Sequence, residues 1–250
     1  MYTLKKSLGQ HFLRDESVCQ RIVQELQQAP FRQLLEVGPG GGALTRHLTS
    51  FPGVDFKAVE LDAEKVSYLL HQYPGLVGRI IEGSILDLPL PFEGGFTIIG
   101  NFPYNISSQI LFRVLDWREQ VERVVGMFQK EVAVRIAAGP GSKDYGILSV
   151  LLQAYYEVSY LFEVGEQCFQ PPPKVKSGVV SLTHKGNPYH ITQHRKFHVL
   201  VKTAFGQRRK QLRNPLKGLF PARELSDPVF SQRAEQLSVA DYVALIPRMS

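Results

Sequence analysis

Short apolar runs alternate with amphipathic segments along most of the chain. The runs predict seven strands, at residues 33–37, 54–61, 79–82, 96–100, 123–128, 160–164 and 178–183. Segments with helical periodicity separate most of them, at 63–72, 107–115 and 130–138 and from residue 44 onward. Strands that alternate with helices form mainly parallel sheets, whereas the last two strands are close enough in sequence for a hairpin. The pattern predicts an α/β fold around a seven-stranded, mostly parallel sheet.

The C-terminal quarter has a different pattern. A Lys-Gly-Asn-Pro sequence at 185–188 interrupts the alternation, and only helical periodicity follows it. One helix face is formed by residues spaced three and four apart: Phe197, Leu200, Val201, Ala204 and Phe205. We therefore expect an α/β domain at residues 1–185 and a small, all-helical domain at 186–250.

Composition narrows the class of protein. The 250 residues are 44% hydrophobic and 21% charged, which excludes a disordered or collagen-like chain. The only two cysteines, Cys19 and Cys168, exclude a disulfide scaffold and a multi-cysteine zinc site. No apolar run approaches the roughly 18 residues of a spanning helix, and the first residues lack the apolar core of a signal peptide. We expect a cytoplasmic protein that does not bind a membrane.

The net charge of +6 is concentrated near the C-terminus. From His184 to Ser250 there are 12 lysines and arginines against four aspartates and glutamates, whereas residues 1–183 carry 17 basic and 19 acidic side chains. The basic group Arg208, Arg209, Lys210 and Arg213 follows the apolar helix face. This charge fits either a nucleic-acid partner or a solvated basic face. His190, His194 and His198 share helical spacing, but no carboxylate or cysteine completes a metal site, so no metal is expected.

A glycine-rich loop follows the first strand of the predicted sheet. Gly38-Pro39-Gly40-Gly41-Gly42 lets the backbone turn sharply before a helix whose N-terminus offers unpaired N–H groups. The second strand ends at Glu60, whose carboxylate can accept both ribose hydroxyls of a nucleoside. An adenosine-containing cofactor is expected. The spacing fits both dinucleotide loops and the Glu36, Gly38, Gly40, Gly42 pattern of S-adenosylmethionine enzymes, so the loop alone does not separate the two.

The fourth strand leads directly into Asn101-Phe102-Pro103-Tyr104. This tetrapeptide matches the motif of enzymes that methylate an exocyclic amine, whose lone pair is delocalised into the base. The Asn101 side-chain oxygen and the Phe102 carbonyl can accept the two N–H bonds and hold the nitrogen in line with a methyl group, while Tyr104 stacks on the base. An ordinary Asn-x-Pro turn is the alternative, and the glycine loop and Glu60 argue against it.

With these motifs the sequence resembles the ribosomal RNA adenine N6-dimethyltransferases of the KsgA/RsmA type along nearly its whole length. The matching segments are Gly9–Leu13, Glu36–Thr45, Asn101–Ser107, Met127–Ala133, Gly141–Gly146, Phe169–Val175 and Phe205–Asn214. The resemblance implies a Rossmann-like, class I S-adenosylmethionine-dependent methyltransferase domain and a helical C-terminal domain that binds the ribosomal particle. It also implies dimethylation of N6 in two adjacent adenosines of the 3′-terminal hairpin loop of 16S ribosomal RNA, a step in ribosome biogenesis.

The resemblance assigns roles to individual residues. It places the cofactor against His11, Leu13, Gly38, Gly40, Glu60, Ser84 and Asn101. It makes Asn101, Phe102, Pro103 and Tyr104 catalytic. It places the target base against Tyr104 and Phe169, and the RNA against Arg208, Arg209, Lys210 and Arg213. The small ribosomal subunit is the expected partner of a monomeric enzyme.

Two positions depart from the family pattern. The family usually has an aspartate where Ser84 stands, and a serine hydroxyl accepts the same bond from the cofactor's adenine amine more weakly because it is uncharged. A nearby carboxylate, Asp87, either substitutes for it or is a turn residue. Lys176 stands where an aspartate is common, and it either contacts a phosphate or is a neutral surface change.

Other functions remain open at this point. A catalytically weak RNA-binding assembly factor of the same fold would share the basic C-terminal quarter. Methylation of a protein glutamine would use the same tetrapeptide, because an amide nitrogen is delocalised in the same way. A dehydrogenase would leave the tetrapeptide without a role and lacks a proton-donating constellation.

Overall fold

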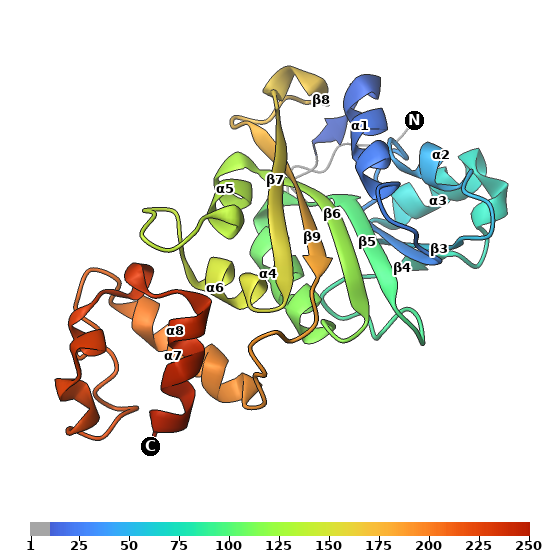
Figure 1. Ribbon diagram of the computed structural model, residues 1–250. Coiled ribbons are helices and arrows are strands. Elements are labelled where there is room, and N and C mark those ends of the chain that lie inside the picture. Colours follow the sequence, from blue (N-terminus) through green and yellow to red (C-terminus); the bar gives the residue numbers. More distant parts are fainter. Residues whose placement is uncertain (1–10) are drawn as a thin grey trace. The chain divides into compact units, whose positions relative to one another are not determined.

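The computed structural model describes residues 11–250 (Figure 1). Its strands are β1 (Phe12–Leu13), β2 (Gln33–Val37), β3 (Asp55–Glu60), β4 (Ile80–Glu82), β5 (Phe96–Asn101), β6 (Val121–Gln129), β7 (Tyr156–Val164), β8 (Phe169–Gln170) and β9 (Ser177–His184). Its α-helices are α1 (Glu16–Leu26), α2 (Thr45–Leu48), α3 (Ala63–Gln72), α4 (Ser107–Asp116), α5 (Lys130–Ala137), α6 (Ile147–Gln153), α7 (His194–Gly206) and α8 (Val239–Leu245). Short 3₁₀ turns connect several of them.

The central sheet has seven strands in the order β4-β3-β2-β5-β6-β9-β7. The pairs β4-β3, β3-β2, β2-β5 and β5-β6 are parallel, and β6-β9 is antiparallel. The seven predicted strands and the mostly parallel sheet are therefore confirmed, with β7 beginning four residues before the predicted position. β7 and β9, the predicted hairpin pair, are neighbours in this sheet.

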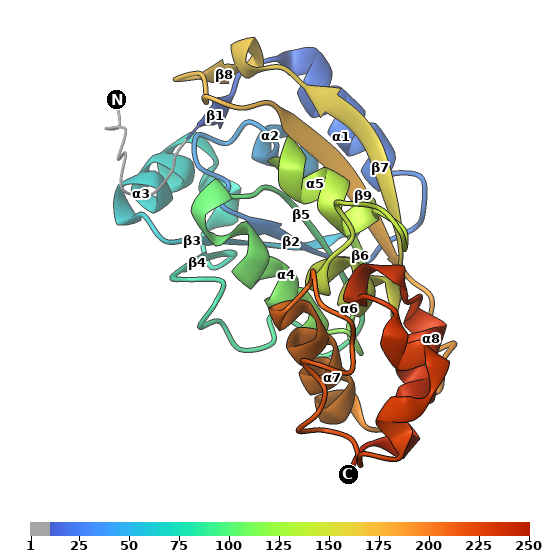
Figure 2. The ribbon, with the colours of Figure 1, turned by 90° about the vertical axis from the view of Figure 1, so that its left-hand side faces the viewer.

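Helix α1, which the sequence analysis did not predict, packs on one face of the sheet. Asp15 caps it by accepting hydrogen bonds from the N–H groups of Ser17 and Val18. Its apolar face joins a core formed by alternate strand residues, including Leu34 of β2, Ile99 of β5 and Val125 of β6. Figure 2 shows α1 and α4 on opposite sides of β2 and β5. The strands are thus covered on both faces, which explains their continuous apolar sequences.

A second, two-stranded sheet joins distant parts of the chain. β1 and β8 pair antiparallel, with Phe12 opposite Gln170 and Leu13 opposite Phe169. The Arg14 N–H extends the contact by donating to the Cys168 carbonyl at 2.8 Å. The pairing places the N-terminal segment beside the residues that precede β9.

The chain divides into two compact units. The first comprises residues 1–133 and 159–184, and the second comprises residues 134–158 and 185–250. The division after residue 184 lies next to the predicted boundary at 185, but the second unit also includes residues 134–158, which the prediction assigned to the first domain. Its helices are α6, α7 and α8. Of the predicted apolar face of α7, Phe197, Leu200, Val201 and Ala204 are buried and Phe205 is half-buried. No helix within residues 11–250 has both the length and the apolar character needed to cross a membrane.

Candidate active site

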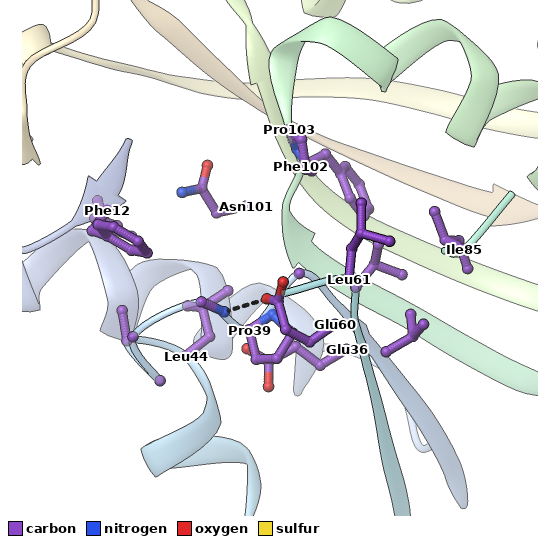
Figure 3. A pocket seen from close by; sticks show the side chains of 18 of the residues that line it. Phe12, Glu36, Pro39, Leu44, Glu60, Leu61, Ile85, Asn101, Phe102 and Pro103 are labelled. Carbon is purple, nitrogen blue, oxygen red and sulfur yellow. Dashed lines mark hydrogen bonds between the residues drawn. The ribbon is translucent and has the colours of Figure 1, made fainter. Parts of the chain in front are cut away.

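A cavity of about 610 Å³ opens where β2, β3 and β5 end (Figure 3). Ligand sites of parallel α/β sheets form at this edge, because the carboxyl ends of the strands and the loops that follow them meet there. Four segments contribute most of its lining: residues 11–14, 36–44, 83–86 and 101–106, together with Val59, Glu60 and Leu61.

The glycine loop bends in a way that needs glycine. Gly38, Gly40 and Gly42 have φ angles of +67°, +55° and +82°, in the left-handed region that side chains disfavour. A side chain on Gly40 would also bring its Cβ to 2.8 Å from the Phe12 ring. Gly38 and Gly40 both line the cavity, as the sequence analysis predicts for a cofactor loop.

Glu60 is buried and held in one orientation at the end of β3. Its Oε2 accepts a hydrogen bond from the Gly40 N–H and its Oε1 accepts one from the Asp62 N–H, both at 3.0 Å (Figure 3 shows the first). Each carboxylate oxygen has two lone pairs, so both oxygens can accept a further bond. The carboxylate is therefore fixed in place with the capacity to bind a diol.

The carboxyl group of Glu36 is hydrogen-bonded within the fold. It is 1% exposed and accepts a hydrogen bond from the Thr45 hydroxyl at 2.8 Å, which joins β2 to α2. Burial raises the pKa of Glu36 to about 8, although the Thr45 bond favours the ionised form. A neutral carboxylic acid is therefore favoured at this position.

Ser84 lines the cavity, and its Oγ accepts a hydrogen bond from the Leu86 N–H at 3.1 Å. Asp87 is exposed and is not among the lining residues. Its main-chain N–H donates to the Ser84 carbonyl, so Asp87 occupies a turn and does not replace the missing aspartate. Ser84 supplies the side-chain oxygen at this part of the wall.

Asn101 ends β5 with its side-chain amide held by the N-terminal segment. Nδ2 donates to the His11 carbonyl at 3.0 Å. In Figure 3 the amide nitrogen is turned toward the side of Phe12 and the oxygen away from it. The His11 contact thus leaves Oδ1, the acceptor, for a ligand in the cavity.

Phe102 is a lining residue of the cavity whose ring packs in the core. The ring is 1% exposed and packs against Phe128 with 4.8 Å between centroids. Gly100 and Gly126 make room for it, since a Cβ on Gly126 would lie 2.2 Å from a ring carbon. The Phe102 N–H donates to the Met127 carbonyl at 3.1 Å, which fixes the backbone at the motif. The glycines within the two strands are the signal in the sequence for this packing, which was not predicted.

Tyr104 begins the 3₁₀ turn Tyr104–Ile106 and is half-buried. Its hydroxyl lies 2.5 Å from Ser177 Oγ, and its ring is stacked with the His11 imidazole at 5.6 Å between centroids and 28° between planes. Burial raises the pKa of Tyr104, so the phenol is neutral at ordinary pH. The contact with Ser177 was not predicted from the sequence.

The structure brings all the predicted cofactor and catalytic residues into one cavity, which is lined by His11, Leu13, Gly38, Gly40, Glu60, Ser84, Asn101, Phe102, Pro103 and Tyr104. Gly9 and Gln10 of the N-terminal motif lie outside the described residues. Phe169 is not a lining residue; it is 4% exposed and belongs to the same core as α1. Its contact with a target base stays a prediction.

The predicted RNA-binding side chains differ in their surroundings. Arg208 donates to the main-chain carbonyls of Ser142 and Lys143 and lies 3.6 Å from Glu235, so it holds a loop of its own unit. Arg209, Lys210 and Arg213 are exposed, and Arg213 also donates to the Ser231 hydroxyl. Arg209 and Lys210 therefore have the exposure that a phosphate contact needs.

The second departure from the family pattern, Lys176, is paired in the structure. Its ammonium group and that of Lys130 each bind one carboxylate oxygen of Glu163. These two bonds lower the pKa of the Glu163 carboxyl below its ordinary value. One carboxylate thus joins the beginning of α5, the edge strand β7 and the approach to β9.

Comparisons with known proteins agree with the site. Residues 1–249 match the family model "Ribosomal RNA adenine dimethylase". The chain is 52% identical over 247 residues to "Ribosomal RNA small subunit methyltransferase A" of Porphyromonas gingivalis, covering 96% of this chain and 95% of the relative. It is 51% identical over 246 residues to the protein of the same name from Parabacteroides distasonis, covering 96% and 92%.

Two solved structures have the same fold. A dimethyladenosine transferase from Plasmodium falciparum superposes with a TM-score of 0.80 at 24% identity, covering 94% of this chain and 96% of the other. The 23S rRNA methyltransferase ErmE superposes with a TM-score of 0.75 at 22% identity, covering 95% and 99%. These likenesses confirm the class I methyltransferase fold. The family match and the identity to curated relatives show that the chain belongs to the ribosomal RNA adenine dimethylase family.

Proposed function

We propose that this protein dimethylates N6 of two adjacent adenosines in the 3′-terminal hairpin loop of 16S ribosomal RNA, in the small ribosomal subunit, as a cytoplasmic monomer. The carrying observation is the position of the Asn101-Phe102-Pro103-Tyr104 motif, which lines the same cavity as the glycine loop and Glu60. Relatives about half identical over nearly the whole chain have names that describe small-subunit ribosomal RNA methylation.

The cavity fits S-adenosylmethionine. Glu60 has acceptor capacity for two ribose hydroxyls, and the glycine loop comes close to it without side chains. The apolar side chains of Leu61 and Ile85 line the cavity beside Ser84, where an adenine ring can pack. When bound, S-adenosylmethionine supplies an electrophilic methyl group.

The protein's own residues place the amine for attack. Asn101 Oδ1 and the Phe102 carbonyl accept the two N6 hydrogens and increase electron density on the nitrogen. Tyr104 stacks on the base and limits its tilt. A loop base reaches this position by leaving its stack, at modest cost when it is not fully paired. No general base is needed before the methyl group moves, since the amine attacks through its own lone pair.

The direct test is transfer of labelled methyl groups from S-adenosylmethionine to under-methylated small subunits, followed by digestion of the RNA to nucleosides. We expect N6,N6-dimethyladenosine at two adjacent positions. Tight, salt-sensitive particle binding without transfer would overturn the proposal in favour of an RNA-binding assembly factor of the same fold.

Restoring an aspartate at position 84 is expected to strengthen cofactor binding. Ser84 lines the cavity, and a carboxylate accepts a hydrogen bond about twice as strongly as a hydroxyl. Titration calorimetry of Ser84→Asp should show an S-adenosylmethionine Kd about fivefold lower than that of the wild type. Ser67→Asp adds the same charge on an exposed position of α3 outside the cavity and is the matched control. An equal Kd for both variants and the wild type would contradict the assigned position of Ser84.

Reversing two exposed charges in the second unit is expected to weaken particle binding. Arg209→Glu/Lys210→Glu should reduce the slope of log Kd against log salt by about two, because two fewer counterions are released on binding. The S-adenosylmethionine Kd should stay unchanged. Arg208 is left intact because it holds a loop. Arg32→Glu/Arg79→Glu makes the same charge change at exposed positions that precede β2 and β4, at the edge opposite the cavity. Equal salt slopes for the two double variants would show that Arg209 and Lys210 form only a solvated face.

A further inference from the structure

We propose that Ser177 is a positioning residue for the target base, acting through Tyr104, and that the second methyl transfer depends on it more than the first. This inference rests on the proposed function. It begins with a contact that the mechanism above does not use, the 2.5 Å approach of the Tyr104 hydroxyl to Ser177 Oγ.

Ser177 is a rigid anchor. Its side chain has no solvent exposure, and it is the first residue of β9, opposite Gln129 of β6. The β6-β9 ladder continues without interruption from this pair to Arg123 and Thr183. The serine hydroxyl is therefore fixed to the central sheet, whereas Tyr104 belongs to a short turn after a proline.

Two contacts together determine the plane of the Tyr104 ring. The Ser177 bond holds the hydroxyl end of the ring, and the His11 imidazole lies against the ring face. His11 is itself held, because its Nδ1 lies 2.9 Å from the Pro171 carbonyl. A base that stacks on Tyr104 takes its tilt from this ring, so the serine hydroxyl determines where N6 lies relative to Asn101 and Phe102.

The two transfers make unequal demands on this orientation. Each transfer forms an N6–C bond, breaks a sulfonium S–C bond of the donor and releases one N6 proton to solvent. Before the first transfer, N6 carries two hydrogens, which both acceptors can bind. Before the second it carries one, so one acceptor has lost its partner and stacking on Tyr104 supplies a larger share of the orientation. Loosening the ring should therefore slow the second transfer more than the first.

The test compares Ser177→Ala with Ser181→Ala in single-turnover reactions on under-methylated small subunits. Ser181 lies in the same strand, and its Oγ accepts from Arg123 at 3.4 Å, whereas Ser177 is the partner of Tyr104. We expect Ser177→Ala to slow the second transfer about fivefold more than the first, so that N6-methyladenosine accumulates. Ser181→Ala should give the wild-type ratio of monomethyl to dimethyl product. The S-adenosylmethionine Kd should stay unchanged in both.

Tyr104→Phe is an independent test, because it removes the Tyr104 hydroxyl from the bond with Ser177 and keeps the aromatic ring. It should also accumulate N6-methyladenosine, and the double variant should be no worse than either single variant. This test decides the question even where Ser177→Ala does not fold. An unchanged product ratio, or equal slowing of both transfers, would overturn the role of Ser177. A wild-type protein that makes no dimethyladenosine would overturn the proposed function itself.

Discussion

Asn101→Ala is expected to slow methyl transfer by about 10²–10³-fold, or roughly 3 kcal/mol in the barrier. The substitution removes Oδ1, one of the two acceptors that we propose for the reacting amine. That oxygen is available because the amide nitrogen is already bonded to the His11 carbonyl. The Phe102 carbonyl belongs to the main chain, so it is kept in the variant and accounts for residual activity.

The measurement is the single-turnover rate on under-methylated small subunits, with cofactor and particle affinities measured separately. The particle affinity should stay near the wild-type value, because the exposed Arg209 and Lys210 are unchanged. Gln109→Ala removes an amide from an exposed position of α4 outside the cavity and should behave as the wild type. Near-normal turnover in Asn101→Ala would rule out the role given to Oδ1.

The parts of the site that could be predicted from the sequence are those with local signals. A glycine loop after an apolar strand has few structural solutions, and a parallel sheet brings the ends of its strands to one edge. Glu60 at the end of β3 and Asn101 at the end of β5 therefore lie at the same edge as the loop that follows Val37. They are also neighbours of that loop, because β2 lies between β3 and β5, and this strand order was not predicted.

The parts that could not be predicted depend on contacts between distant segments. β1 and β8 are two residues each, too short for periodicity to reveal, yet their pairing places Phe169 opposite Leu13 and in the core. From the sequence, Arg208 was predicted to bind RNA together with three neighbouring basic side chains. In the structure it donates hydrogen bonds to the carbonyl groups of a loop near residue 142. A local sequence pattern shows the charge and hydrogen-bonding groups of such a side chain, but it does not show which distant groups bind them.

The second compact unit shows the same limit at the level of domains. Residues 134–158 lie between the predicted strands at 123–128 and 160–164, so we assigned them to the α/β domain. In the structure α6 contacts α7, which begins about 40 residues later in the chain. The Lys-Gly-Asn-Pro segment contains turn-forming residues, so it shows where one boundary lies. No comparable turn-forming signal in the sequence shows that α6 packs with helices of the second unit.

Gly126→Ala is expected to cost stability and activity together. A Cβ at this position would lie 2.2 Å from one ring carbon of Phe102 and 2.9 Å from another, and the ring is buried against Phe128. Overpacking of this kind costs about 1–3 kcal/mol. In the proposed mechanism the Phe102 carbonyl is an acceptor for the reacting amine, so we expect a displaced ring also to move this part of the main chain. A shift of an ångström at such a group can cost about 10²-fold in rate.

The experiment compares Gly126→Ala with Gly75→Ala by thermal unfolding and single-turnover methyl transfer. A Cβ at Gly75, in the 3₁₀ turn Pro74–Leu76, meets no atom within 4 Å, so this control should keep the wild-type rate. Phe102→Leu in the Gly126→Ala background should recover part of the lost stability, because the smaller side chain vacates the space that the new methyl group needs. Wild-type stability and rate in Gly126→Ala would contradict this expectation and would mean that the Phe102 ring can move without its main chain. The position of the Phe102 carbonyl would then depend only on the hydrogen bond between the Phe102 N–H and the Met127 carbonyl.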